Sequence, residues 1–183
     1  MTGSAWLNSS AQTTPWLTAN ESFGTVSGHV ILGTDSSATP THYNVIATPT
    51  QLQNINTTGL SGKYVLGKDL DLSSIANFTP IGNNSRHFTG IFDGLNHTIS
   101  NLTIARSSSN YVGLFGWTSG ATLRNIGLVG GSVTGGSNVG ALVGYNSKGQ
   151  ITNVYAAGSV TGSYQVGGLV GLSRGPITNA YAT

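Results

Sequence analysis

Val139-Gly140-Ala141-Leu142-Val143-Gly144 is one of three stretches of this chain that can be laid on one another. The other two are Val112-Gly113-Leu114-Phe115-Gly116 and Val166-Gly167-Gly168-Leu169-Val170-Gly171, so the stretches begin about 27 residues apart. A fixed period of this size is typical of a chain that stacks on itself, with each repeat covering the apolar face of its neighbour. The sequence therefore predicts a repeat architecture rather than one central core.

Two further columns of residues recur with this period. Residues 123–126 align with residues 151–154 and 177–180, and residues 131–135 align with residues 158–162. Each repeat thus holds three short apolar runs bounded by Gly, Ser and Asn, which is typical of strands, and no run has a helical period of 3.6 residues. Three strands in about 27 residues suffice for one coil that stacks about 4.8 Å from the next. The sequence predicts an all-β fold, a parallel β-helix (β-solenoid).

Side chains at equivalent positions of the repeats should share one environment. Leu and the β-branched residues of each run are expected to point inward and to stack coil on coil, because apolar burial is the main source of stability in such a fold. The expected inward set is Val112, Leu114, Val133, Val139, Leu142, Ile151, Val160, Val166, Leu169 and Ile177.

The composition excludes several classes of protein. Hydrophobic residues make up 38% of the chain and charged residues 7%, which is too apolar for a disordered tail. The net charge of +2 comes from scattered Lys and Arg without a basic cluster, which argues against nucleic-acid binding. No run of about 18 apolar residues is present, so no membrane insertion is expected. The chain has no cysteine and hence no disulfide.

The pattern divides the chain into three parts. Residues 1–42 are expected to be an irregular N-terminal segment, whose first four residues are typical of an expression leader. Residues 43–110 are expected to form diverged β-helix coils with a loop insertion at 73–86. Within them, residues 50–55 are expected to form the only helical turn. Residues 111–183 form regular repeats, and we expect them to be truncated at the C-terminus because no polar cap follows the last repeat.

The repeats resemble a known family. Residues 139–144, with the Asn, Gly, Ile and Tyr-Ala positions that follow up to residue 162, resemble the GLUG-type repeat of bacterial surface proteins. Residues 43–102 are similar to the segment that precedes such repeats in filamentous haemagglutinin-like exoproteins. The resemblance implies a right-handed β-helical adhesin fragment that is secreted or lies on the bacterial cell surface. It also implies two partners: the flanking β-helix of the parent chain and a host-cell glycan or protein receptor.

Asn125, Asn153 and Asn179 form the sharpest column of polar residues. Stacked Asn side chains carry both donors and acceptors, so they can hydrogen-bond along the axis and satisfy the backbone of a corner. We therefore expect a structural ladder here, with ligand binding as the alternative.

Aromatic residues form two other columns. Trp117 and Tyr145 occupy equivalent positions of successive repeats, as do Tyr155 and Tyr181. Such rings either pack against one another or, where they are exposed, offer a platform for a sugar ring. These four residues are the candidates for glycan contact.

An enzyme needs convergent titratable groups, and the chain is poor in acids. The residues Asp69 and Asp71 share one face of a strand and are the only close carboxylate pair, while no nucleophile signature or metal-ligand spacing appears. We expect no catalysis, no metal and no cofactor. The expected function is that of a stiff, non-catalytic stalk. The alternative is a carbohydrate-binding or polysaccharide-cleaving β-helix domain.

N-x-Ser/Thr sequons lie in the first 101 residues and not in the regular repeats. The sequon is an acceptor signal for N-glycosylation in secreted proteins, although a chain rich in Ser, Thr and Asn contains many by chance. The candidate positions are Asn56, Asn77, Asn83, Asn96 and Asn101.

Overall fold

The computed structural model describes residues 5–6, 16–20, 29–33 and 41–183. Strands β1 (Ala5–Trp6), β2 (Trp16–Asn20), β3 (His29–Gly33) and β4 (Thr41–Ile46) pair antiparallel in chain order. The expected leader at residues 1–4 lies outside the described residues and stays a prediction.

All pairings after β4 are parallel. The strands are β5 (Lys63–Leu66), β6 (Leu70–Asp71), β7 (Ile91–Asp93), β8 (Thr98–Ser100), β9 (Thr103–Ala105), β10 (Phe115–Ser119), β11 (Thr122–Thr134), β12 (Ser137–Gly140), β13 (Val143–Ser147), β14 (Gln150–Thr161), β15 (Tyr164–Gly167), β16 (Val170–Ser173) and β17 (Ile177–Ala182).

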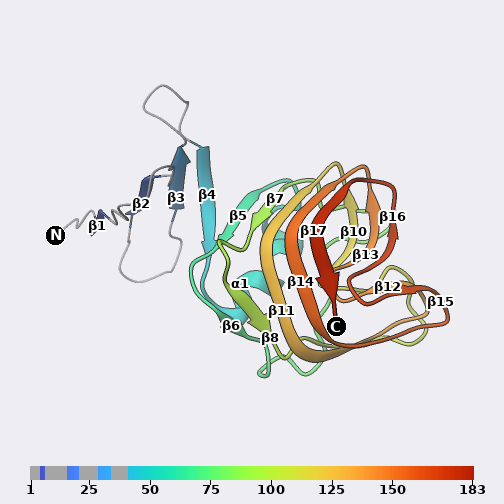
Figure 1. Cartoon of the computed structure of the whole chain (residues 1–183). Coiled ribbons are helices and arrows are strands. Elements are labelled where there is room, and N and C mark those ends of the chain that lie inside the picture. The colour runs from blue at the N-terminus through green and yellow to red at the C-terminus, as the bar shows by residue number, and fades with distance from the viewer. Residues whose placement is uncertain (1–4, 7–15, 21–28, 34–40) are drawn as a thin grey trace.

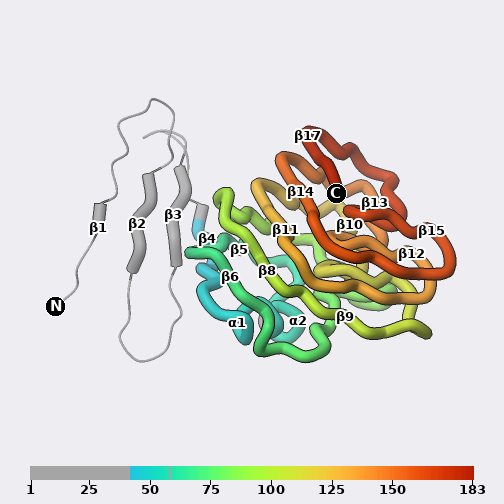
Figure 2. The backbone as a smooth tube through the Cα atoms, turned by 60° about the horizontal axis from the view of Figure 1, so that its bottom comes forward, coloured from blue at the N-terminus to red at the C-terminus, as the bar shows by residue number. Residues whose placement is uncertain are grey.

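The strands stack into three sheets that surround one interior. The largest sheet follows the order β4-β5-β7-β11-β14-β17, a second follows β10-β13-β16, and β12 pairs with β15. Figure 1 looks along the stack from the C-terminal end, and the chain winds toward the viewer in the right-handed sense. Figure 2 shows the coils from the side, with the C-terminal coil at the top. The predicted parallel β-helix is confirmed.

The register follows the sequence repeat and has one irregularity. Leu123 lies opposite Ile151, which lies opposite Ile177. Between the pairs Val129–Ala157 and Ser132–Ser159, however, β11 has one residue more than β14. This β-bulge accommodates the difference in length between the two coils.

Corners are formed by residues with positive φ, and several of these are not glycine. Asn125, Asn153 and Asn179 have φ values of 55°, 53° and 50°, so the long strands β11 and β14 each bend at their Asn. Asn tolerates this left-handed conformation better than most residues do, because its short polar side chain bonds locally. The Asn column therefore sets the position of a corner in each coil.

The interior is a continuous apolar core. Leu114, Val139, Leu142 and Ile151 have exposed fractions of 0%. Each fully buried aliphatic side chain stabilises the fold by roughly 1.5–3 kcal/mol before chain entropy is counted. The helices α1 (Pro49–Gln53) and α2 (Ile55–Thr58) lie at the N-terminal end of the stack (Figure 2) and contribute buried side chains to this core.

Two residues of the expected inward set are exposed. Val166 is 43% exposed and Ile177 is 42% exposed, whereas their register partners Val139 and Ile151 are completely buried. Val166 and Ile177 continue the inward columns of Val139 and Ile151, but no described coil covers their other side. The burial of an inward position thus depends on the next coil as well as on its own.

Candidate functional site

The Asn column is a hydrogen-bonded ladder on the outside of the stack. Asn153 Nδ2 donates to Asn125 Oδ1 at 3.2 Å, and Asn179 Nδ2 donates to Asn153 Oδ1 at 3.1 Å. Each of these donations thus runs toward the N-terminus, from one coil to the coil before it. The side-chain amides therefore hydrogen-bond to one another, and their role is structural.

Asp93 ends this ladder on the N-terminal side. Its side chain is 4% exposed, and it accepts from Asn125 Nδ2 at 2.9 Å and from the Leu95 backbone N–H at 2.9 Å. Its other oxygen accepts from Arg124 Nε at 2.7 Å. Burial lowers the pKa of Arg124, but the hydrogen bond and the charge of Asp93 outweigh it, so the pKa lies above its ordinary value. The carboxylate is fully engaged.

A second polar ladder lies inside the stack, and the sequence analysis missed it. Thr118, Asn146 and Ser173 are in register, and Asn146 is completely buried. Asn146 Oδ1 accepts from Thr118 Oγ1 at 2.9 Å and from the Gly149 backbone N–H at 3.1 Å. Its Nδ2 donates to the Gly149 carbonyl oxygen and to Ser173 Oγ, each at 2.9 Å. The sequence did contain a signal for this ladder, because a polar residue directly follows each position of the aromatic column that includes Trp117 and Tyr145.

Trp117 and Tyr145 belong to a packed aromatic cluster. The His87 ring stacks on Trp117 at 4.8 Å between centroids, and Tyr111 lies 4.6 Å from it. Tyr145 is 8% exposed and meets Trp117 edge-on at 4.5 Å. The guanidinium carbon of Arg174 lies 5.9 Å from the Tyr145 ring centroid. These rings contact one another, so packing accounts for much of their surface.

Tyr155 and Tyr181 form a separate stack. Their rings lie 5.5 Å apart at an interplanar angle of 9°, and Tyr181 is 59% exposed. Tyr155 lies over Gly127, where a Cβ atom would collide with its ring. This stack stands on the β14–β17 sheet and the Trp117 cluster on the β10–β13–β16 sheet (Figure 1), so the four candidate aromatic residues form no single platform.

Asp69 and Asp71 bind the chain next to them. Asp69 Oδ1 accepts from the Thr98 backbone N–H at 2.7 Å and lies 3.2 Å from His97 Nδ1. Asp71 Oδ1 accepts from Asn101 Nδ2 at 2.9 Å. The Thr98 hydrogen bond lowers the pKa of Asp69, and the Asn101 hydrogen bond lowers that of Asp71. Both carboxylates thus hold β6 and its flanks against the segment around β8.

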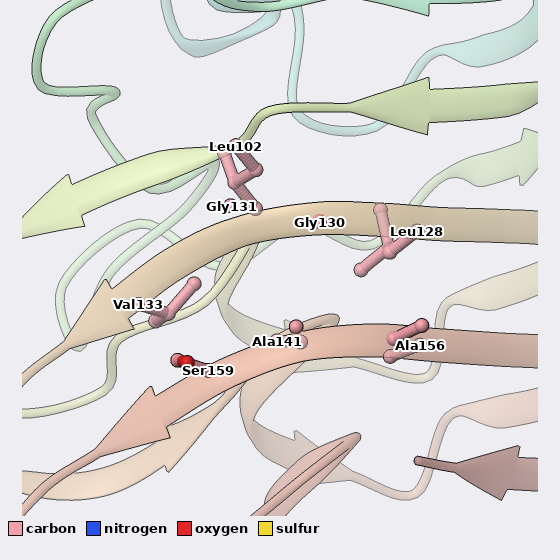
Figure 3. A pocket seen from close by; sticks show the side chains of 10 residues that line it. Leu102, Leu128, Gly130, Gly131, Val133, Ala141, Ala156 and Ser159 are labelled. Atoms are coloured by element: carbon pink, nitrogen blue, oxygen red, sulfur yellow. The ribbon is translucent and has the colours of Figure 1, made fainter.

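A small pocket lies at the corner where β11 carries its extra residue (Figure 3). It is lined mainly by apolar and glycine residues, among them Leu102, Leu128, Gly131 and Ala156. Its cavity volume of about 10 Å³ is far below the roughly 300–1,000 Å³ of typical ligand pockets. We interpret it as incomplete packing beside the bulge.

The described residues contain no group of three or more His, Cys, Asp or Glu side chains arranged to hold a metal ion. None of their helices combines the length and the apolar character needed to cross a membrane.

The register and the corner residues identify the repeat unit. Residues 135–161 match the GLUG motif. They begin at the corner before β12 and end with β14, so the motif covers one complete coil. The resemblance on which the sequence analysis relied is thereby confirmed for the repeat. The likeness to filamentous haemagglutinins is not, and it stays a proposal.

Two relatives extend the similarity beyond one coil. "Halomucin" of Haloquadratum walsbyi is 36% identical over 143 residues, which are 72% of this chain and 2% of that protein. A "putative Gly-rich membrane protein" of Evansella cellulosilytica is 34% identical over 120 residues, 60% of this chain and 14% of that protein. The chain thus spans a small part of these relatives, whose names indicate a surface-associated protein. No solved structure matches the chain.

Proposed function

We propose that the chain is a non-catalytic, stiff β-helical stalk segment of a secreted or surface-exposed bacterial adhesin of the filamentous haemagglutinin type. The observation that carries this proposal is the pair of ladders that cross successive coils. One runs from Asp93 to Asn179 on the outside, and the other from Thr118 to Ser173 inside. Networks that tie each coil to the next resist bending and local opening.

The stack favours transmission of force along its axis. Parallel strands of neighbouring coils share backbone hydrogen bonds, and core side chains such as Leu142 and Val139 are buried between coils. In a solenoid each repeat contacts only its neighbours, so added repeats extend the rod without changing its cross-section. A flanking β-helix of the parent chain would cover Val166 and Ile177, and we propose it as the partner at this end.

The engaged carboxylates support a role without catalysis. Asp93, Asp69 and Asp71 each hold neighbouring backbone or side-chain donors. Catalytic acids and bases instead converge on an open cleft. A host-cell glycan or protein receptor would then be bound elsewhere in the parent chain or on the exposed rings of this segment.

A glycan-array screen of the purified 183-residue chain, combined with a reducing-end assay on plant and bacterial polysaccharides, tests the proposal. The stalk predicts no sugar release and no selective binding at micromolar concentration. Selective binding that is lost in Trp117→Ala or Tyr181→Ala, but kept in Tyr164→Ala, would make the segment itself the adhesive surface. Tyr164 is 64% exposed and lies outside both aromatic clusters, so it is the matched control.

A further inference from the structure

The sequons differ in what their Asn side chains do in the folded chain. Transfer of a sugar to Asn needs a side-chain nitrogen that is exposed and free to react. A nitrogen that already donates hydrogen bonds to the protein is held in place, and it becomes available only after local opening. The structure therefore divides the sequon positions into two groups.

Three sequon positions have engaged nitrogens. Asn56 Nδ2 donates to the Pro80 carbonyl oxygen at 3.0 Å, while its Oδ1 accepts from the Gly82 N–H at 2.9 Å. Asn77 exchanges two hydrogen bonds with the Ala105 backbone, at 3.2 and 3.1 Å. Asn101 Nδ2 donates to Asp71 Oδ1. These side chains replace missing strand or turn contacts.

Asn83 presents its nitrogen to solvent. Its Oδ1 accepts from the backbone N–H groups of Ser85 and Arg86, each at 2.9 Å, and its own N–H donates to the Arg86 carbonyl oxygen. This is a turn held by the Asn oxygen, so the amide group is oriented with Nδ2 outward. The residue is exposed, and Nδ2 has no hydrogen-bond partner among the described residues.

Asn96 is also exposed, and its backbone conformation is left-handed with φ of 65°. Its backbone N–H donates to the Asn125 carbonyl oxygen at 3.0 Å, which fixes the residue on the corner of the stack. Its side chain makes no hydrogen bond within the described part of the chain. A bulky group on this amide would extend into solvent without displacing a contact.

We infer that, among the sequons of residues 41–183, Asn83 and Asn96 are the N-glycosylation sites, and that Asn56, Asn77 and Asn101 are structural. The donor is a nucleoside-diphosphate sugar, and a separate transferase supplies the base. The Asn nitrogen forms a bond to the sugar C1 atom, the C1–O bond to the nucleoside diphosphate breaks, and the nucleoside diphosphate leaves with the electron pair. The proton from the amide nitrogen passes to the base. This inference does not depend on the stalk role.

Glycosylation of the folded chain in vitro tests the inference. The full chain is incubated with a soluble N-glycosyltransferase that reads N-x-Ser/Thr and with UDP-glucose, and hexose addition is mapped by peptide mass spectrometry. Synthetic peptides carrying each sequon give the rate without folded structure. We expect Asn83 and Asn96 to be modified in the folded chain as fast as in their peptides. Modification of Asn56, Asn77 and Asn101 should be at least about tenfold slower in the folded chain than in their peptides. Unmodified Asn83 and Asn96, with reactive peptides, would overturn the inference, as would equal modification of all sequons.

A variant pair provides a sharper control at Asn101. Asp71→Ala removes the acceptor of Asn101 Nδ2 and should raise modification at this residue toward the level of Asn96. Asp71→Asn keeps an acceptor oxygen and should leave Asn101 protected. Equal modification of Asn101 in the two variants would contradict the proposed role of the engaged nitrogen. Ser85→Ala, which keeps the backbone N–H bound by Asn83 but destroys its sequon, should abolish modification at Asn83 alone.

Discussion

Asn125 donates its side-chain amide to the buried carboxylate of Asp93 at 2.9 Å. The exposed Asn ladder therefore ends on a charged acceptor, and charge-assisted hydrogen bonds are about twice as strong as neutral ones. Arg124 compensates that charge at 2.7 Å. The ladder is thus anchored to the diverged part of the sheet by an ion pair.

Removal of Asp93 should destabilise the fold. Asp93→Ala leaves Arg124 and Asn125 without their acceptor, and we expect a loss of about 2–4 kcal/mol in the free energy of unfolding. We place it below the value for a fully buried pair because Arg124 is 40% exposed. Asp93→Asn keeps one acceptor and should lose less. Urea unfolding checks both variants, and equal stability of Asp93→Ala and the parent chain would contradict the anchoring role.

Substitutions of Asn153, in the middle of the Asn ladder, separate the contribution of side-chain hydrogen bonds to stability from that of backbone strain. Asn153→Gly removes two side-chain hydrogen bonds but keeps the left-handed corner, whereas Asn153→Ala also strains the backbone at φ of 53°. We expect Ala to be less stable than Gly by about 1 kcal/mol, and Gly to be less stable than Asn. Thermal unfolding of the three chains measures the order. Asn84→Ala, on an exposed loop, is the control that should change little.

The interior ladder should be more sensitive than the exterior one. Asn146→Ala leaves the Gly149 backbone groups and the hydroxyl of Thr118 unpaired in a buried site, and we expect a loss of about 3 kcal/mol or more. Ser173→Ala removes only the last contact and should cost about 1 kcal/mol. Chemical denaturation of the two variants gives the comparison. A smaller loss in Asn146→Ala than in Ser173→Ala would refute this assignment.

Stability should fall in acid partly through Asp69 and Asp71. Their folded pKa values lie below the ordinary Asp value of 3.8 because they accept hydrogen bonds. A group with a lowered folded pKa stabilises fully above the unfolded value, and this contribution is lost as pH falls through the folded value. The Asp69→Asn/Asp71→Asn double variant should therefore show a shallower decline in melting temperature as the pH falls below about 4. An unchanged slope would show that these two carboxylates do not contribute to the loss of stability in acid.

The stacking register is tested at Leu142, which is completely buried. Leu142→Asp places an unpaired charge between neighbouring coils and should abolish the cooperative melt of the regular repeats. Val129→Asp, at a position that is 41% exposed, should cost less than about 1 kcal/mol. A melting curve of Leu142→Asp that overlays that of the parent chain would show the register to be wrong.

The sequence predicted the repeat region in detail because its coils are nearly equal in length. The Asn residues of the ladder are 28 and 26 residues apart, so columns read from the sequence become neighbours in space. Asp93 could not be found in this way, because it lies 32 residues before Asn125 and carries a different side chain. The buried hydrogen bonds of Asn146 were likewise hidden, since periodicity does not distinguish an inward polar residue from an outward one.

By itself the sequence determined the solenoid, its period and the corner positions, since the repeated short apolar runs and Asn residues impose the same local conformation in every coil. Only the tertiary structure decided which side chains are covered. Val139 and Val166 occupy the same repeat position, yet one is buried and the other is 43% exposed. The engagement of the Asn56, Asn77 and Asn101 nitrogens was decided in the same way. The physical reason is that burial and hydrogen bonding depend on the neighbouring coil, and a local pattern contains no information about that neighbour.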